Sequence, residues 1–219
     1  GKLIVNTVGV NIDKYSPIDD TKYLFNRYNI SNKKIILTMS RLEERKGFDK
    51  ILESMPYLIK KIPEIKYVIA GKGPFEHELK LLTKKLNLEN HVIFTGFIDE
   101  SEKVKLYNAC DVFAMPSRNI DGDVEGFPIV YMEANSCGKP VIGGKSGGIE
   151  EAIIDGYNGF TVDPWSVKDI TEKLQLILLD DKLRLKLGEN GRKKCIEENN
   201  ISMKSDNFIR IIDGLNFNA

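Results

Sequence analysis

Short β-branched runs alternate with longer helical patterns along most of this chain, and this alternation restricts the fold more than any other feature. The run KIILTMS at 34–40 is short and apolar, which indicates a buried strand. The segment that follows it, 47–62, carries apolar residues at helical spacing. Further strands are expected at 66–71, 91–96, 111–117, 139–144 and 159–162. Further helices are expected at 75–88, 101–110 and 126–137.

Strands separated by helices of this length form right-handed βαβ units, because parallel neighbours need a long crossover connection. The sequence therefore predicts an α/β fold, a Rossmann-like parallel sheet with helices on both faces. Beyond residue 166 the patterns become helical, at 166–179, 181–199 and 202–215. Residues 1–30 differ: an apolar start, turn-forming residues and a polar helix candidate predict an edge strand and a connector between domains.

Charge and cysteine usage exclude several classes of protein. Lys plus Arg and Asp plus Glu both number 32, so no net field attracts nucleic acid or an anionic membrane surface. No apolar run is long enough to cross a bilayer. Cys110, Cys137 and Cys195 are far apart and odd in number, which predicts reduced, packed thiols with no disulfide framework and no zinc site.

In an open parallel sheet, ligands bind at the carboxyl ends of the strands. Glycines in the loops expected there would let a ligand approach the backbone, a pattern that favours a nucleotide or phosphate site without defining a reaction. Arg41 and Lys46 flank the first of these loops. A guanidinium fork and an ammonium could together hold a diphosphate without a metal. Taken alone, a solvated charged turn explains the pair better.

The stretch DVEGFPIVYMEANSCGKPVI, 123–142, contains an expected helix start. Gly126, Phe127 and Pro128 stand where the helix should begin, and proline suits a first helical turn. Free N–H groups at such a terminus bind anions. Because proline has no N–H, the donors would be those of Phe127, Ile129 and Val130.

Two carboxylates bracket this helix start. Glu125 and Glu133 are eight residues apart, about 12 Å if the whole run were helical. That distance is too long for a dyad sharing one proton, and it suits two acids at opposite ends of one extended ligand. The alternatives are a buried acid satisfied by the backbone or a lysine for Glu133, and an exposed acid at the helix start for Glu125.

Five motifs occur in order along the chain: SRLEERKG, AGKGP, FTGFID, MPS followed by EGFPIVYMEANSCGKPVI, and SGGIEEAIIDGYNGFTVDP. This ordered set is far more specific than any one motif, and it covers roughly residues 1–200. It closely resembles the C-terminal, donor-binding domain of retaining glycosyltransferases with the GT-B fold, glycosyltransferase family 4. The long run around the two acids looks most like the mannosyltransferase branch, and VGVNIDKYSP departs from the family's connector at Val8 and Asn11.

The resemblance implies a role for each candidate residue. Arg41 and Lys46 would neutralise the donor diphosphate, and Glu133 would bind the ribose hydroxyls. Glu125, the expected catalytic residue, would contact the donor sugar and stabilise positive charge at its anomeric carbon. Backbone contacts to phosphate and sugar would come from Gly126, Phe127, Ile129 and Val130, and the base would be bordered by Gly73, Phe97 and Ile98. No metal or other cofactor is expected, since the nucleotide-sugar is a substrate.

The resemblance also implies a missing half. We expect a connector and edge strand at 1–30, the nucleotide-sugar-binding domain at 31–200, and at 201–219 a helix that packs on an absent N-terminal acceptor domain. In that helix region, Phe208, Ile211, Ile212 and Leu215 would then be exposed. Alone, the chain should be an inactive donor half. The full-length protein is expected in the cytoplasm, with any contact to the membrane face made through absent sequence.

The expected reaction is transfer of a hexose, mannose from GDP-mannose, to a bacterial glycolipid or polysaccharide. A UDP-sugar donor remains open, because base choice depends on backbone contacts. A non-catalytic nucleotide-binding module is a further alternative, although the presence of Arg41, Lys46, Glu125 and Glu133 argues against it. An NAD-dependent oxidoreductase is disfavoured because the first loop lacks a G-x-G-x-x-G turn. A nucleic-acid partner is disfavoured by the absence of a basic face.

Overall fold

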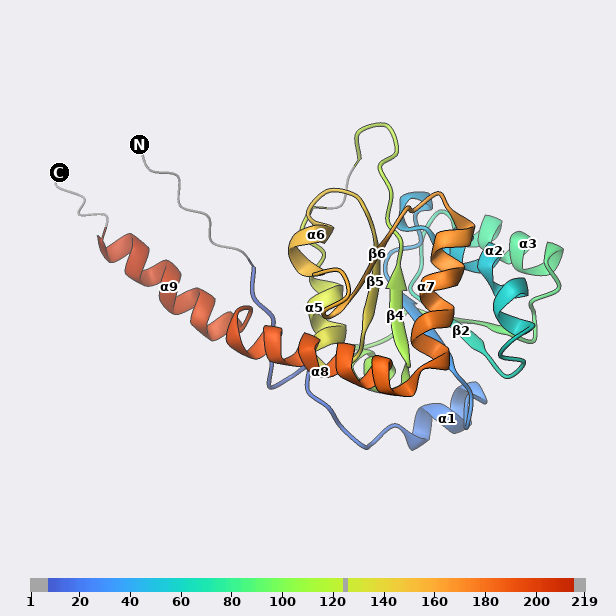
Figure 1. Cartoon of the computed structure of the whole chain (residues 1–219), viewed down its shortest axis with the longest axis horizontal. Coiled ribbons are helices and arrows are strands. Elements are labelled where there is room, and N and C mark those ends of the chain that lie inside the picture. The colour runs from blue at the N-terminus through green and yellow to red at the C-terminus, as the bar shows by residue number, and fades with distance from the viewer. Residues whose placement is uncertain (1–7, 124–125, 215–219) are drawn as a thin grey trace.

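The computed structural model describes residues 8–123 and 126–214. Within these ranges the chain forms a parallel six-stranded sheet with the order β3-β2-β1-β4-β5-β6. Helices flank this sheet (Figure 1). The predicted α/β fold with a Rossmann-like parallel sheet is confirmed, and the strands expected between residues 34 and 162 are all present. The strands are β1 (Ile35–Met39), β2 (Lys66–Ala70), β3 (Val92–Gly96), β4 (Val112–Met115), β5 (Val141–Gly144) and β6 (Gly159–Val162).

Helices connect consecutive strands and continue after the last one. The predicted helices are all present, and the four-residue α6 is an addition too short to produce a periodic sequence pattern. The helices are α1 (Lys22–Tyr28), α2 (Phe48–Ile59), α3 (Glu76–Lys85), α4 (Glu100–Ala109), α5 (Ile129–Ser136), α6 (Ile149–Ala152), α7 (Val167–Leu179), α8 (Asp181–Glu197) and α9 (Ile201–Gly214). A short 3₁₀ turn, Glu44–Lys46, precedes α2.

The sheet separates two apolar cores because successive side chains on a strand point to opposite faces. Ile36 of β1 packs in a core with residues of α2, α3 and α7. Its neighbours Ile35 and Leu37 pack in the other core, with residues of α1, α4, α5 and α6. All five residues of β1 are buried, as expected for a strand covered on both faces.

The segment around Val10 pairs with the short connection between α8 and α9. The N–H of Val10 donates to the carbonyl of Asn199 at 2.7 Å, and the N–H of Ile201 donates to the carbonyl of Val10 at 3.0 Å. Residues 8–30 contain this single bridge and α1 but no strand. The apolar start that suggested an edge strand lies in residues 1–7, outside the described residues.

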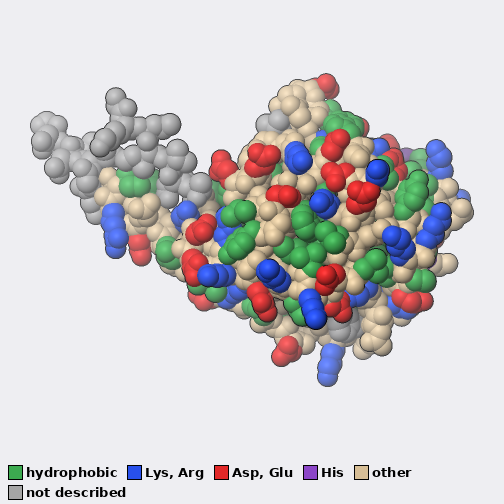
Figure 2. Space-filling view, in the orientation of Figure 1, with side chains coloured by type: hydrophobic (Ala, Val, Ile, Leu, Met, Phe, Trp, Pro, Cys, Tyr) green, Lys and Arg blue, Asp and Glu red, His purple; other side chains and the backbone are tan. Residues whose placement is uncertain are grey.

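Helix α9 extends away from the body of the domain (Figure 1). Phe208 and Ile212 are 50% and 41% exposed, as expected, whereas Ile211 is partly buried. Leu215 lies outside the described residues. In the part of the chain that the structure covers, no helix is both long and apolar enough to cross a membrane. Figure 2 shows acidic and basic side chains interspersed on the visible face, without a continuous basic patch.

The three cysteines are free and packed in the apolar core, as the sequence predicts. Cys110, Cys137 and Cys195 are each 2% exposed. Burial raises the pKa of each thiol to about 12, because a thiolate would lose its hydration there. The folded chain therefore holds its thiols protonated at pH values at which an unfolded chain ionises them.

We expect the free energy of unfolding to fall as pH rises from about 9 towards 12. The unfolded chain loses its thiol protons near the ordinary cysteine pKa, whereas the folded chain keeps them until about 12, so alkaline solution favours unfolding. Urea titrations at several pH values measure this change. Labelling with a thiol reagent at pH 8 is the control: the folded chain should be slow to react and the unfolded chain fast. Fast labelling of the folded chain would contradict thiol burial.

Candidate nucleotide site at the carboxyl ends of the strands

The strand order reverses between β1 and β4, which places a crevice at the carboxyl ends of these strands. The loops after β1 and β2 form one wall, and glycines let them touch. A Cβ on Gly71 would lie 2.0 Å from the carbonyl oxygen of Ser40, and one on Gly73 would lie 2.3 Å from that of Leu42. Gly73, expected to border a base, therefore keeps two loops in backbone contact next to the crevice.

A hollow of about 380 Å³ lies at these strand ends. The last residues of β1 and β2 and the loops after β1, β2 and β3 line it, together with one residue each from α4 and α5. The hollow brings together four residues that the sequence singled out: Arg41, Phe97, Ile98 and Val130. The remaining lining residues are Met39, Ser40, Ala70, Gly71, Lys72 and Lys103.

The two predicted diphosphate-binding cations have different surroundings. The side chain of Arg41 is 71% exposed, and its Nε lies 3.4 Å from the carboxylate of Glu43. Lys46 is only 7% exposed, in the 3₁₀ turn before α2, and it does not line the hollow. A solvated charged turn describes Arg41 but not Lys46, so the two residues are not one exposed pair.

Glu133 is buried and its carboxylate is already hydrogen-bonded. It is 6% exposed, and Lys103 Nζ and the Tyr107 hydroxyl donate to its two oxygens at 2.7 and 2.8 Å. The alternative interpretation, a buried acid satisfied by a lysine, therefore describes Glu133 in this structure. Burial and the adjacent carboxylate raise the pKa of Tyr107, which keeps the hydroxyl protonated as a donor. Each carboxylate oxygen can accept a second hydrogen bond.

Lys103 connects this buried acid to the hollow. It lines the hollow and bonds to Glu133, so the acid lies directly behind the wall. Sequence reasoning missed Lys103, because its partner is 30 residues away and no spacing marks the pair. It also missed Lys72, although this residue stands within the quoted GKGP motif. Together with Arg41 these lysines make the hollow a cationic site that suits an anionic ligand.

The segment before α5 corrects the expected helix start. The helix begins at Ile129, and Pro128 precedes it in an extended conformation, with φ −77° and ψ 102°. Proline also biases the preceding Phe127 away from helical geometry. The expected start at Gly126 is therefore wrong, and the 12 Å spacing based on a fully helical run does not apply. Ile129 is exposed and Val130 half-buried at this terminus.

Gly126 lies in close contact with the loop after β5. A Cβ on Gly148 would lie 2.0 Å from the carbonyl oxygen of Gly126, so the two loops meet through backbone atoms. Phe127 is partly buried against the apolar core on this side of the sheet. The loop after β5 thus supports the segment that leads into α5. Glu125, the expected catalytic residue, falls outside the described residues.

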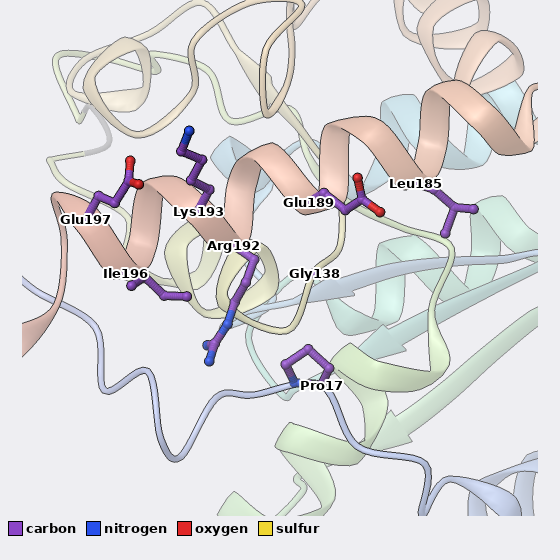
Figure 3. A pocket seen from close by; sticks show the side chains of 8 residues that line it. All are labelled: Pro17, Gly138, Leu185, Glu189, Arg192, Lys193, Ile196 and Glu197. Atoms are coloured by element: carbon purple, nitrogen blue, oxygen red, sulfur yellow. The ribbon is translucent and has the colours of Figure 1, made fainter.

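A second hollow, about 390 Å³, lies between α8 and the segment around Pro17 (Figure 3). Nη1 of Arg192 points into this region but is engaged, at 2.9 to 3.0 Å, with the carbonyl oxygens of Ile12, Tyr15 and Ser136. Arg192 therefore attaches the N-terminal segment to α5 and α8. This hollow is not at the carboxyl ends of the strands, so we assign the candidate site to the hollow beside Arg41.

Comparison with known proteins places this geometry in a family. Residues 20–194 match the model for glycosyl transferases group 1. A GDP-mannose-dependent alpha-(1-6)-phosphatidylinositol monomannoside mannosyltransferase of Mycolicibacterium smegmatis is 36% identical over 187 residues. The match covers 84% of this chain and 49% of that protein, so the chain spans about half the length of the curated relatives it matches.

Two solved structures have the same fold. The C-terminal domain of LpcC, a group 1 glycosyl transferase of Francisella tularensis, is 30% identical with a TM-score of 0.78; the match covers 88% of this chain and 100% of that domain. HepE of Anabaena in complex with UDP is 25% identical with a TM-score of 0.85; the match covers 94% of this chain and 56% of that protein. This chain, whose sheet has the Rossmann-like topology of a GT-B domain, therefore belongs to the group 1 glycosyl transferase family.

Proposed function

We propose that this chain is the C-terminal, donor-binding domain of a retaining family 4 glycosyltransferase. The full protein would transfer a hexose, mannose from GDP-mannose, to a glycolipid or polysaccharide acceptor. One observation carries this proposal: the hollow at the strand ends gathers Arg41, Phe97, Ile98 and Val130 and is backed by the Lys103–Glu133 pair. The mannosyltransferase relative supports the choice of donor.

The hollow offers a suitable environment for each part of a nucleotide. Phe97 is 79% exposed, and an exposed aromatic ring can stack on a base. Lys103 and Glu133 together could bind ribose hydroxyls, which both donate and accept hydrogen bonds. The diphosphate would lie towards Arg41 and the start of α5, where helix N–H groups favour negative charge.

The proposed catalysis is electrostatic. The diphosphate leaves with added negative charge, and fixed donors aimed at that charge would stabilise the transition state most. Arg41 and Lys46 would supply cations, and Gly126, Phe127, Ile129 and Val130 would supply backbone contacts. Glu125 would stabilise the positive charge that grows at the anomeric carbon. The nucleotide-sugar is then a substrate, and the mechanism uses no metal.

A UDP-sugar donor is the second candidate. The UDP complex of HepE supports it, because that protein shares the fold over most of this chain. The lining of the hollow does not discriminate between bases, since an aromatic ring stacks on either one.

The acceptor would bind to a further domain. The chain spans about half the length of its mannosyltransferase relative, which agrees with a second, N-terminal domain across the cleft. The exposed side chains of α9 would pack on that domain, and contact with the cytoplasmic face of the membrane would be made by sequence outside this chain.

We expect calorimetric titration to show that the chain binds GDP and GDP-mannose in preference to UDP and UDP-glucose. Glu133→Gln keeps the size of the side chain and removes its charge, so GDP should bind about tenfold more weakly. Glu172→Gln, an exposed change on α7, is the matched control and should have no effect. Preference for the uracil pair would move the protein to another branch of the family. Wild type that binds none of the four would contradict the proposed function.

Arg41→Ala should weaken GDP binding by about tenfold, because it removes charge-assisted hydrogen bonds to the diphosphate. The fold should be unaffected, since the side chain is 71% exposed and its ion pair with Glu43 is loose. Lys168→Ala is the control, with a cation that is 85% exposed on α7. The same titration measures both variants, and an unchanged GDP affinity in Arg41→Ala would remove this residue from the site.

The isolated chain should transfer no sugar, because the acceptor and the opposite wall of the cleft would come from another domain. Incubation with radiolabelled GDP-mannose and a bacterial lipid extract, followed by extraction of the lipid fraction, tests this expectation. Binding of GDP in the titration is the control for a folded, competent donor site. Substantial transfer by this chain alone would contradict the two-domain mechanism.

A further inference from the structure

Two arginines, one from each loop, connect the loops after β1 and β4. Nη1 of Arg118, after β4, lies 2.9 and 3.0 Å from the carboxylate oxygens of Asp49 in the first turn of α2. Nε of Arg45, after β1, lies 2.9 Å from the carboxylate of Asp123, in the loop after β4. The N–H of Arg118 also donates to the carbonyl of Arg45 at 2.8 Å. We name these four residues the loop brace: Arg45, Asp49, Arg118 and Asp123.

The Arg118 half of the loop brace is buried and rigid. Arg118 is 1% exposed, its guanidinium lies 4.5 Å from the centre of the Trp165 ring, and the Asp49 side chain is 14% exposed. Ion pairs exposed to solvent contribute little to stability. A buried pair is costly to break, because the charge that remains is left in the interior with neither a partner nor water to stabilise it. A planar guanidinium that is stacked and hydrogen-bonded also has little freedom to reorient.

The two loops also touch through their backbones, at a glycine. Gly47 has φ +76°, and a Cβ on it would lie 2.3 Å from the carbonyl oxygen of Pro116. Gly47, which follows the 3₁₀ turn that carries Lys46, therefore packs directly against Pro116, which follows β4. The loop brace joins loops that are already in contact, and it limits how they can shift along each other.

Glu43 extends the loop brace to the proposed diphosphate site. Its carboxylate lies 3.3 Å from Nε of Arg45 and 3.4 Å from Nε of Arg41. A series of charged contacts therefore runs from Asp123, near the segment that leads into α5, to Arg41, which lines the hollow. Neither Arg118 nor Asp123 lines the hollow itself.

We propose that the loop brace is a positioning device for the diphosphate of the bound nucleotide. It would hold the loop of Arg41 and Lys46 at a set distance from Gly126 and the start of α5. Both segments could then contact the diphosphate without having to become ordered when the nucleotide binds. A preorganised site pays less entropy on binding. This inference rests on the proposed donor-binding function and adds Arg118 and Asp123 as positioning residues.

Asp123→Asn tests the exposed half of the loop brace, and Arg118→Lys tests the buried half. The Asp123 side chain is 67% exposed, so its replacement should not affect folding. We expect GDP affinity to fall about threefold in Asp123→Asn, which removes the ion pair with Arg45, and about tenfold in Arg118→Lys, which loosens the charge-assisted hydrogen bonds to Asp49. Guanosine, which lacks the diphosphate, should bind as it does to wild type. Calorimetric titration with GDP and guanosine, and with UDP and uridine, measures both quantities.

Asp121→Asn is the matched control, an exposed acid in the same loop outside the brace, and it should leave GDP binding unchanged. Urea unfolding of each variant shows whether the fold is retained. If Arg118→Lys is unstable, the GDP affinity of Asp123→Asn alone tests the inference. The inference would be overturned if a brace variant lost as much affinity for guanosine as for GDP, or if both brace variants bound GDP as wild type does. Either result would leave the proposed donor function standing. Wild type that binds neither nucleotide would overturn both.

Discussion

The reversal of strand order between β1 and β4 is the constraint on which the rest of the structure depends. Because the crossovers on either side of this point run in opposite directions, the helices after β1 and β4 cover opposite faces of the sheet, and a crevice forms at the carboxyl ends of these strands. The residues that line the hollow come from the ends of β1 and β2, from the loops after β1, β2 and β3, and from α4 and α5. Helices on both faces bury β1 and β4 completely, so the positions from which these loops start are set by the core.

Close packing of loops against loops follows from that constraint. Gly47, Gly73 and Gly148 each sit where a Cβ would lie within 2.3 Å of a backbone oxygen in a neighbouring loop. Backbone contacts of this kind leave little room for movement, because protein interiors are packed as densely as organic crystals. Charged pairs then act on segments that are already close together: Lys103 with Glu133 behind the hollow, and Arg118 with Asp49 beneath the loops.

The strands were predictable because a fully buried strand reads as a short apolar run, and β1 is such a run. The start of α5 was predicted three residues early because a proline can occupy the first helical turn, whereas Pro128 stands before it in an extended conformation. Of the candidate site, Arg41 was found because topology says where strand ends meet, and Phe97 and Ile98 were found through the resemblance to the glycosyltransferase family. Lys103 and Arg118 were missed, since each acts through a partner 30 or more residues away.

The sequence by itself determined the fold class, the succession of strands and helices along the chain, and the loops at which a ligand would bind. These follow from local patterns of apolar residues and from the handedness of βαβ crossovers. Only the tertiary structure decided that Arg41 is exposed while Lys46 is buried, and that Glu133 is held by Lys103 and Tyr107. Whether a charge is solvated or paired depends on which distant segments pack around it, and this information is not contained in its neighbours along the chain.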